Sequence, residues 1–391
     1  MPSGFRHHRL CLGGPGVVVI AALLAGGCAT SGLDRARDQF YQAHPQQAVQ
    51  HLEATQPAGK DEVLVLMERG MARHMAGDYR ASSSDFLRAS SRLEELDTYS
   101  VSKGSATWVI NDTVQDFRGK PYERTLLHTF AALDFMALRE WDRVAVEARR
   151  LIETVDLDIR GDYSDEPFSR YVAGVCFELI NDQSSAAFQY RQLKTIVLRL
   201  NIDPEIGRFS PTTNAVAQPF VDSSHELIFF FMLGRGAQGS QFFSPALVSA
   251  NTGPVYAELY ARGAYLGRTH TLSDTWHLAA VTEKEEAARK AMKTAARVAV
   301  KEAIAESFES TSDELEDLVR LILIGLLEQP DLRAWLTLPR WLQAARVPCP
   351  PDLDEYEVVL KTQSGQEISR HTVNQPISRQ GRTFVSFHRN L

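Results

Sequence analysis

The sequence has no block of basic residues and no excess of positive charge. Its 391 residues include 42 Lys and Arg against 49 Asp and Glu, a formal net charge of −7 at pH 7. Proteins that bind nucleic acids present clustered positive charge to phosphates, and anionic membrane surfaces attract polybasic stretches. The composition therefore argues against nucleic acid as a partner and against membrane attachment through basic side chains.

Long apolar runs are also missing. Residues 17–24 form a short apolar run, far below the ~18 apolar residues that a membrane-spanning helix needs. No later run in the sequence is long and apolar enough to span a membrane. Arg6 and Arg9 precede it, and the small residues Ala-Gly-Gly follow at 25–27. A positive start, a short apolar run and small residues are typical of a secretory signal peptide. We therefore expect residues 1–27 to be removed.

Cysteine is scarce, with four in the chain. The stretch Leu-Ala-Gly-Gly-Cys at 24–28 resembles the lipobox of bacterial lipoproteins. The resemblance implies cleavage before Cys28, lipidation of its thiol and a membrane anchor on the periplasmic side. Ala29 stands where an aspartate would resemble an inner-membrane retention signal, so we expect an outer-membrane lipoprotein facing the periplasm. The alternative is an ordinary secretory signal followed by an incidental cysteine.

The first half carries a helical pattern in which small and large apolar residues recur. In the clearest copy, Gly70 precedes a Gly-Asp-Tyr turn at 77–79 and Phe86 follows on the next helix. Small residues let paired helices approach, and large ones fill the space between neighbouring pairs. This pattern is typical of tetratricopeptide repeats, with a generic helical bundle as the alternative. The residues assigned to repeat packing are Gly70, Tyr79, Phe86, Ala89, Ala132, Trp141, Ala148, Gly174, Ala186 and Tyr190.

The copies are unevenly spaced along the chain. The turns at Tyr79, Trp141 and Gln183 are 62 and 42 residues apart, against about 34 in the regular repeat. We expect the Ser-, Thr-, Gly- and Asp-rich stretch 97–120 to be an inserted loop. Residues 201–219 are rich in Pro and turn formers without any period, which predicts a linker.

The second half mixes strands with two helices. Thr282 and Glu285 form a capping box that predicts a long helix to about residue 308, and Thr311 opens a second helix whose apolar run is 318–327. Seven strands are predicted from apolar or alternating runs between turns, the last four forming a small antiparallel sheet: 225–233, 255–260, 264–266, 341–347, 356–361, 368–373 and 382–389.

The predicted fold class is α+β. It comprises a lipoprotein signal peptide (1–27), a helical repeat solenoid of tetratricopeptide type (28–200), a linker (201–219) and a mixed C-terminal domain with antiparallel strands and two long helices (220–391). Removal of residues 1–27 leaves 391 − 27 = 364 residues, a length that favours two domains.

Two stretches carry a family resemblance. Residues 120–151 read KPYERTLLHTFAALDFMALREWDRVAVEARRL and residues 331–351 read DLRAWLTLPRWLQAARVPCPP. Together with the order of the elements between them, they resemble the central repeat and the C-terminal signature of a family of tetratricopeptide-containing bacterial lipoproteins whose function is largely uncharacterised. The resemblance implies an envelope lipoprotein and no known chemistry.

Patterns that carry catalysis are weak. Residues 234–239 spell a dinucleotide-binding fingerprint, but residues 240–245 do not have a helix-forming pattern, so we interpret the motif as a flexible turn. No nucleophile-elbow motif occurs. His270, Asp274 and His277 are close in the sequence and could line a pocket, but a loop beside a strand is the simpler interpretation. Cys176 and Cys349 could bond in an oxidising compartment, and their pairing stays open because their separation is not known from sequence.

These observations favour a non-enzymatic scaffold with no cofactor and no metal. A lipid-anchored repeat domain would present a surface to another envelope protein or lipoprotein of unspecified identity. Two alternatives remain: a subunit of an outer-membrane lipoprotein assembly, and an envelope hydrolase whose residues the sequence does not bring together.

We predict that Cys28→Ser leaves the protein folded but removes its anchor. The substituted chain should be released from the membrane or remain unprocessed, because the lipid on Cys28 is the only attachment that the sequence indicates. Membrane fractionation followed by a high-salt wash measures this. A variant that stays with the washed membranes would show that another attachment exists.

Overall fold

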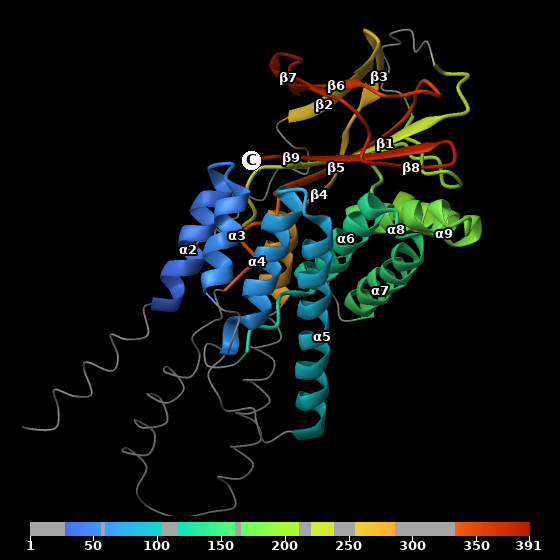
Figure 1. Ribbon diagram of the computed structural model, residues 1–391. Helices are drawn as coiled ribbons and strands as arrows, with labels where there is room; N and C mark the ends of the chain where they lie inside the picture. Colours follow the sequence, from blue (N-terminus) through green and yellow to red (C-terminus); the bar gives the residue numbers. More distant parts are fainter. Residues whose placement is uncertain are drawn as a thin grey trace, which may run out of the picture.

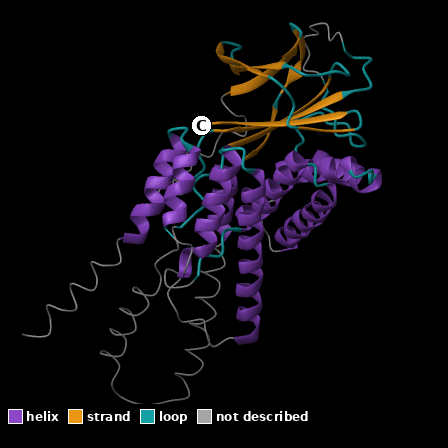
Figure 2. Ribbon diagram, viewed as in Figure 1, coloured by secondary structure: helices purple, strands orange, loops and turns teal. Residues whose placement is uncertain are grey.

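The computed structural model describes residues 28–55, 59–103, 116–160, 166–210, 220–237, 255–285 and 333–391. The chain is an α+β protein with three layers: helices, a first sheet against the helices, and a second sheet beyond it (Figures 1 and 2). Cys28 is the first residue of helix α2 (Cys28–Tyr41). The expected signal peptide, the helix expected over 318–327 and the capping box at Thr311 lie outside the described residues.

Eight helices in the described ranges form successive hairpin pairs, with a short 3-10 turn, η2 (Gly59–Asp61), before the second pair. The pairs are α2 with α3 (Pro45–Ala54), α4 (Glu62–Met75) with α5 (Tyr79–Lys103), α6 (Pro121–Leu138) with α7 (Trp141–Arg160), and α8 (Pro167–Leu179) with α9 (Gln183–Ile196).

The same turn joins the two helices of each of these pairs. It places one residue in the left-handed region, namely Ala43, Gly77, Arg139 and Asn181, with φ of 62°, 79°, 58° and 64°. The next N–H reaches back five residues, as when Asp78 donates to the carbonyl of Arg73 at 3.0 Å. This is the Schellman closure of a helix end. Three of the turns use a residue other than glycine, so the turn is set by the helix packing as well as by backbone freedom.

The residues around these turns keep one phase. A small residue lies seven positions before each left-handed residue, and a buried apolar residue lies sixteen positions after the small one, as in Ala36 with Leu52, Gly70 with Phe86, Ala132 with Ala148, and Gly174 with Tyr190. A Cβ atom on Gly70 would lie 2.5 Å from the ring of Phe86, and one on Gly174 would lie 2.4 Å from the ring of Tyr190. The second helix therefore packs directly on the backbone of the first.

Two stretches expected to be irregular are partly ordered. Helix α5 runs to Lys103, so the loop expected from Asp97 begins no earlier than residue 104. Residues 201–210, expected within a linker, form a small bridge between Ile202 and Phe209, and both side chains are buried. The Tyr171 hydroxyl of α8 donates to the Gly207 carbonyl at 3.0 Å, so this stretch packs on the last helix pair.

The nine described strands form two sheets. They are β1 (Glu226–Leu233), β2 (Val255–Ala261), β3 (Ala264–Arg268), β4 (His270–Asp274), β5 (Trp341–Pro348), β6 (Tyr356–Thr362), β7 (Glu367–Val373), β8 (Ser378–Gln380) and β9 (Thr383–Asn390). The five-stranded sheet has the order β4-β5-β1-β9-β8 and lies against the helices, and the four-stranded sheet has the order β3-β2-β6-β7.

The prediction of one small antiparallel sheet for the tail is wrong. The tail strands divide between the two sheets, and β9 pairs with β1 in parallel. The cause is the position of β1, which is buried along its whole length and has partners on both edges, β5 and β9. An alternating pattern indicates which face of a strand is buried but not which strand lies beside it.

Strand β1 is the centre of the molecule. Its even-numbered residues, Ile228, Phe230 and Met232, belong to the core shared with the helices. Its odd-numbered residues, including Phe229 and Phe231, belong to a second core against the four-stranded sheet. Because both faces are covered, the strand is a continuous apolar run.

The capping box predicted at Thr282 is also wrong. The described helix begins at residue 275, directly after β4, and Thr282 lies inside it. The Thr282 hydroxyl donates to the Leu278 carbonyl at 2.8 Å, the intrahelical bond that Thr makes in the middle of a helix. Asp274 takes the capping role, since its carboxylate accepts the Trp276 N–H at 2.9 Å.

Two further findings concern cysteine and membranes. Cys176 and Cys349 are both buried, and both thiols are free, so the disulfide left open by the sequence is not formed. Burial also raises the pKa of the Cys349 thiol to about 12. Within the described ranges, no helix combines the length and the apolar character needed to cross a membrane.

We predict that Gly70→Ala lowers the free energy of unfolding by about 1–3 kcal/mol, the usual cost of overpacking a core. Helix propensity alone would make the same change stabilising by up to about 1 kcal/mol, so the sign tests the packing. Urea unfolding of the two proteins measures the difference.

The matched control is the same substitution in a Phe86→Leu background. Leucine lacks the ring atoms that the new methyl group would meet, so Gly70→Ala should be nearly neutral there. An equal loss in both backgrounds would show that Phe86 does not limit this site.

Candidate functional site

The residues assigned to repeat packing lie inside the helical layer. Eight are buried and two, Tyr79 and Trp141, are half-buried. They hold helices together and do not line an opening. A binding surface must therefore be sought on the two outer sides of the helical layer.

The first helices of the pairs face a stretch of the chain itself, residues 333–338. The Glu68 carboxylate on α4 accepts the N–H groups of Leu336 and Thr337 at 3.0 and 3.2 Å. Arg37 on α2 donates to the same carboxylate at 2.7 Å and to the Ala334 carbonyl at 3.1 Å. A backbone segment that turns at residues 336–337 is thus held by buried, charge-assisted hydrogen bonds.

Glu123 on α6 extends this contact to a third pair. Its two oxygens accept the N–H groups of Lys120 and Trp335, each at 2.7 Å. Burial raises the pKa of Glu123 to about 7, although the two N–H donors and the Lys120 ammonium favour the ionised carboxylate. Desolvation therefore outweighs the hydrogen bonds at this side chain.

Trp335 fills the space between the helices and this segment. It is 2% exposed, and its ring centroid lies 5.7 Å from that of Phe86 and 5.9 Å from that of Phe130. Its indole N–H donates to Thr337 at 3.0 Å. The side formed by the first helices of three pairs is therefore occupied by the chain's own residues, and by the first sheet beyond them.

A buried ion cluster joins the last pair to the sheet. Arg346 on β5 donates to both oxygens of Glu178 on α8 at 2.7 Å and to Glu226 on β1 at 2.8 Å. Burial alone would raise the pKa of Glu226, but Arg346 and Arg208 beside it hold that pKa below its usual value. The cluster is fully paired, as buried charges need to be.

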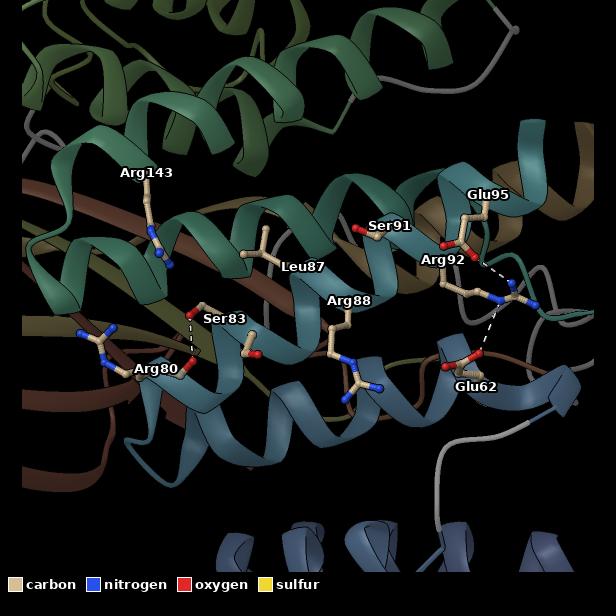
Figure 3. A pocket seen from close by; sticks show the side chains of 10 residues that line it. Glu62, Arg80, Ser83, Leu87, Arg88, Ser91, Arg92, Glu95 and Arg143 are labelled. Atoms are coloured by element: carbon tan, nitrogen blue, oxygen red, sulfur yellow. Dashed lines mark hydrogen bonds and ion pairs between the residues drawn. The ribbon is translucent and has the colours of Figure 1, made fainter. Parts of the chain in front are cut away.

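The opposite side of the helical layer carries an open groove of about 640 Å³. It follows α5, with α4 on one side and the start of α7 on the other (Figure 3). Its lining residues are Glu62, Arg80, Ser83, Ser84, Leu87, Arg88, Ser91, Arg92, Glu95 and Arg143. Nearly all are polar, which favours a ligand bound by hydrogen bonds and charge.

The ion pairs in the groove are unevenly distributed. Arg92 contacts Glu62 at 3.4 Å and Glu95 at 2.8 Å. Arg80 and Arg143 share one acid, Glu140, at 2.8 and 3.2 Å. The groove therefore has an acidic end near Arg92, where two carboxylates face one guanidinium, and a positive end near Arg80.

Arg88 lies between these ends of the groove. No hydrogen bond or ion pair joins its guanidinium to another described residue. Arg88 is also exposed, so its five donors are available to a ligand.

The candidate catalytic residues do not meet. His270 and Asp274 lie at opposite ends of β4, roughly 13 Å apart at the usual rise of a strand. The His270 ring stacks on Phe209 at 4.8 Å, and burial lowers its pKa to about 4. His277 follows within the next helix. Among the described residues, no group of three or more His, Cys, Asp or Glu side chains is arranged to hold a metal ion.

Two histidines on the repeat helices have acidic partners instead. His74 contacts Asp134 at 2.6 Å, and His128 contacts Glu147 at 2.8 Å. Burial raises the pKa of Asp134, and His74 opposes this shift. The His74 ring also stacks on Phe387 of β9 at 5.0 Å. Both pairs link neighbouring helices, and the first also reaches the sheet.

The turn after β1 is part of the same packing. The Gly236 N–H donates to the Leu338 carbonyl at 2.7 Å, and the Arg235 carbonyl accepts the Trp276 indole N–H at 2.9 Å. The last two positions of the glycine motif, 238 and 239, lie outside the described residues. The described part of the motif is a turn packed on residues 338–340.

Glu68, Glu123 and the groove arginines were not predicted from the sequence as site residues. Nothing in the sequence indicates that Glu68 and Glu123 accept backbone N–H groups 212 to 269 residues away. The groove does have a local signal. Positions 80, 84, 88, 91 and 95 are Arg, Ser, Arg, Ser and Glu, a spacing that places them on one face of a helix.

We predict that the Glu123 carboxyl makes stability depend on pH. Its folded pKa of about 7 exceeds the ordinary 4.5, so the folded chain binds this proton more tightly than the unfolded chain. The free energy of unfolding should fall as pH rises from 4.5 through 7, by about 3 kcal/mol in total for this group.

The comparison is with Glu123→Gln, which cannot titrate. Urea unfolding of both proteins at several pH values between 5 and 8 should give a shallower decline for the variant. Parallel pH profiles would show that Glu123 is ionised in the folded protein throughout this range.

No protein-family model matches this chain, and no curated protein or solved structure shows significant similarity to it.

Proposed function

We propose that this chain is a lipid-anchored scaffold of the bacterial cell envelope that binds a protein partner through its helical layer and catalyses no reaction. The signal-like residues 1–27 and Cys28 support the anchor. Ala29 favours the outer membrane, with the protein facing the periplasm.

The helical layer supports a repeat architecture of tetratricopeptide type. The four described pairs share one turn, one position for a small residue and one position for a buried residue, as at Gly70, Gly77 and Phe86. Such repeats present extended surfaces to other proteins. The uneven lengths between pairs distinguish this layer from a regular array.

The open groove along α5 is the observation that carries the proposal. The opposite side of the layer is filled by residues 333–338, whose backbone the helices already bind through Glu68 and Glu123. The groove is an exposed hollow of ligand size on the open side of the layer. A partner would therefore contact the second helix of the pair, α5, rather than the first helices.

In-cell photocrosslinking tests this proposal. We expect a photoreactive residue at Ser91, in the groove, to trap one defined envelope protein. Ser184 is the matched control, because it is also an exposed serine on the second helix of a pair but lies on α9, outside the groove. The same set of adducts from both positions would contradict a specific site. A second lipoprotein as the trapped protein would make the chain a subunit of a lipoprotein assembly.

A further inference from the structure

We propose that the groove along α5 binds an extended acidic peptide segment of the partner in one orientation, with the acidic side chains at the Arg80–Arg143 end and over the central Arg88. This inference rests on the proposed function and adds the chemistry of the ligand. It follows from the length of the groove, from its charge and from the availability of Arg88.

The length of the groove favours a chain over a small anion. The lining residues on α5 run from Arg80 to Glu95, which is about 22 Å at 1.5 Å per helical residue. An extended peptide of about seven residues covers this distance. Leu87 is half-buried near the middle of the groove lining (Figure 3), where it can contact an apolar side chain of the peptide.

The charge of the groove favours acidic side chains at one end. Arg80 and Arg143 lie at this end and share one acid, Glu140. Arg88 adds a further positive charge in the middle of the groove. An excess of positive charge therefore remains. Arg88 is the strongest single attraction, because a guanidinium without a partner can bind a carboxylate through two parallel hydrogen bonds.

The other end of the groove sets the orientation. Glu62 and Glu95 outnumber Arg92, which they both contact. A polymer with negative charge along its whole length would meet repulsion there, which disfavours nucleic acid and polyphosphate. A peptide with acidic residues at one end and a neutral or basic residue at the other matches both ends of the groove.

Serines complete the recognition surface. Ser84 and Ser91 lie one turn on either side of Arg88 and are exposed. Their hydroxyl groups can donate to or accept from a peptide backbone. The stripe from Arg80 to Glu95 thus combines charge recognition with contacts that do not depend on the peptide's sequence.

Selection from a display library of seven-residue peptides on the full, detergent-solubilised chain tests the proposal. We expect enriched peptides with Asp or Glu concentrated at one end and an apolar residue near the centre. Arg88→Glu should abolish this acidic preference or convert it to a basic one. For a synthetic peptide carrying the selected sequence, the same variant should weaken binding at least tenfold.

Arg149→Glu is the matched control. Arg149 is an exposed arginine on α7 that donates to the carbonyl of Ala145 in its own helix and is not among the groove residues. Its replacement changes the net charge equally and should leave the selection and the affinity within twofold of the original. An equal effect of both variants would mean that general electrostatics, not this groove, selects the peptides.

The orientation has its own test. A peptide with the selected sequence reversed has the same composition and charge, and we expect it to bind at least tenfold more weakly. Equal binding of both peptides, or equally tight binding of polyglutamate, would overturn the orientation that Glu62 and Glu95 are proposed to set.

The two proposals can fail separately. If Ser91 traps a defined protein in cells but the selected peptides are basic or uncharged, the scaffold function stands and the acidic ligand is wrong. If Ser91 and Ser184 trap the same proteins and selection is also unaffected by Arg88→Glu, both proposals are wrong.

Discussion

The binding of residues 333–338 by the helical layer is the constraint on which the rest of the structure depends. Glu68 and Glu123 accept three backbone N–H groups of this segment, and Trp335 packs between Phe86 and Phe130. Strand β5 begins three residues after Leu338. The segment therefore brings the five-stranded sheet onto the helices. With its helical side covered by the layer and its other side by the second sheet, β1 is buried on both faces.

This arrangement separates the structural side of the helical layer from the open side. On the structural side, buried carboxylates have hydrogen-bond partners in the chain itself, which is the condition under which burying a charge is tolerated. On the open side, Arg88 is exposed and has no partner among the described residues. A solvated arginine imposes no such cost and keeps its donors free. The two sides thus use charge in opposite ways, one for assembly of the fold and one for recognition.

Much of the secondary structure could be predicted, because it depends on local patterns. The turn signals near Gly77, Arg139 and Asn181 and the small residues seven positions earlier specify the helix pairs. The apolar run of β1 and the alternating tail strands were also recognisable. Strand β4 was missed because it follows β3 after a single residue, and its five residues are too few to show a clear alternating pattern. Thr282 was misassigned because the same hydroxyl can cap a helix or bond within it.

The sequence by itself determined the periodic features: the helix pairs, the central strand and, as a prediction, the signal with Cys28. These follow from spacing, and spacing acts between neighbours along the chain. Only the tertiary structure decided that β9 runs parallel to β1, that Glu68 and Glu123 hold residues 335–337, and that the groove arginines remain open. Each of these depends on contacts between residues far apart in the chain. A carboxylate on a helix looks the same in the sequence whether a distant backbone N–H or a water molecule donates to it, and only the folded chain distinguishes the two.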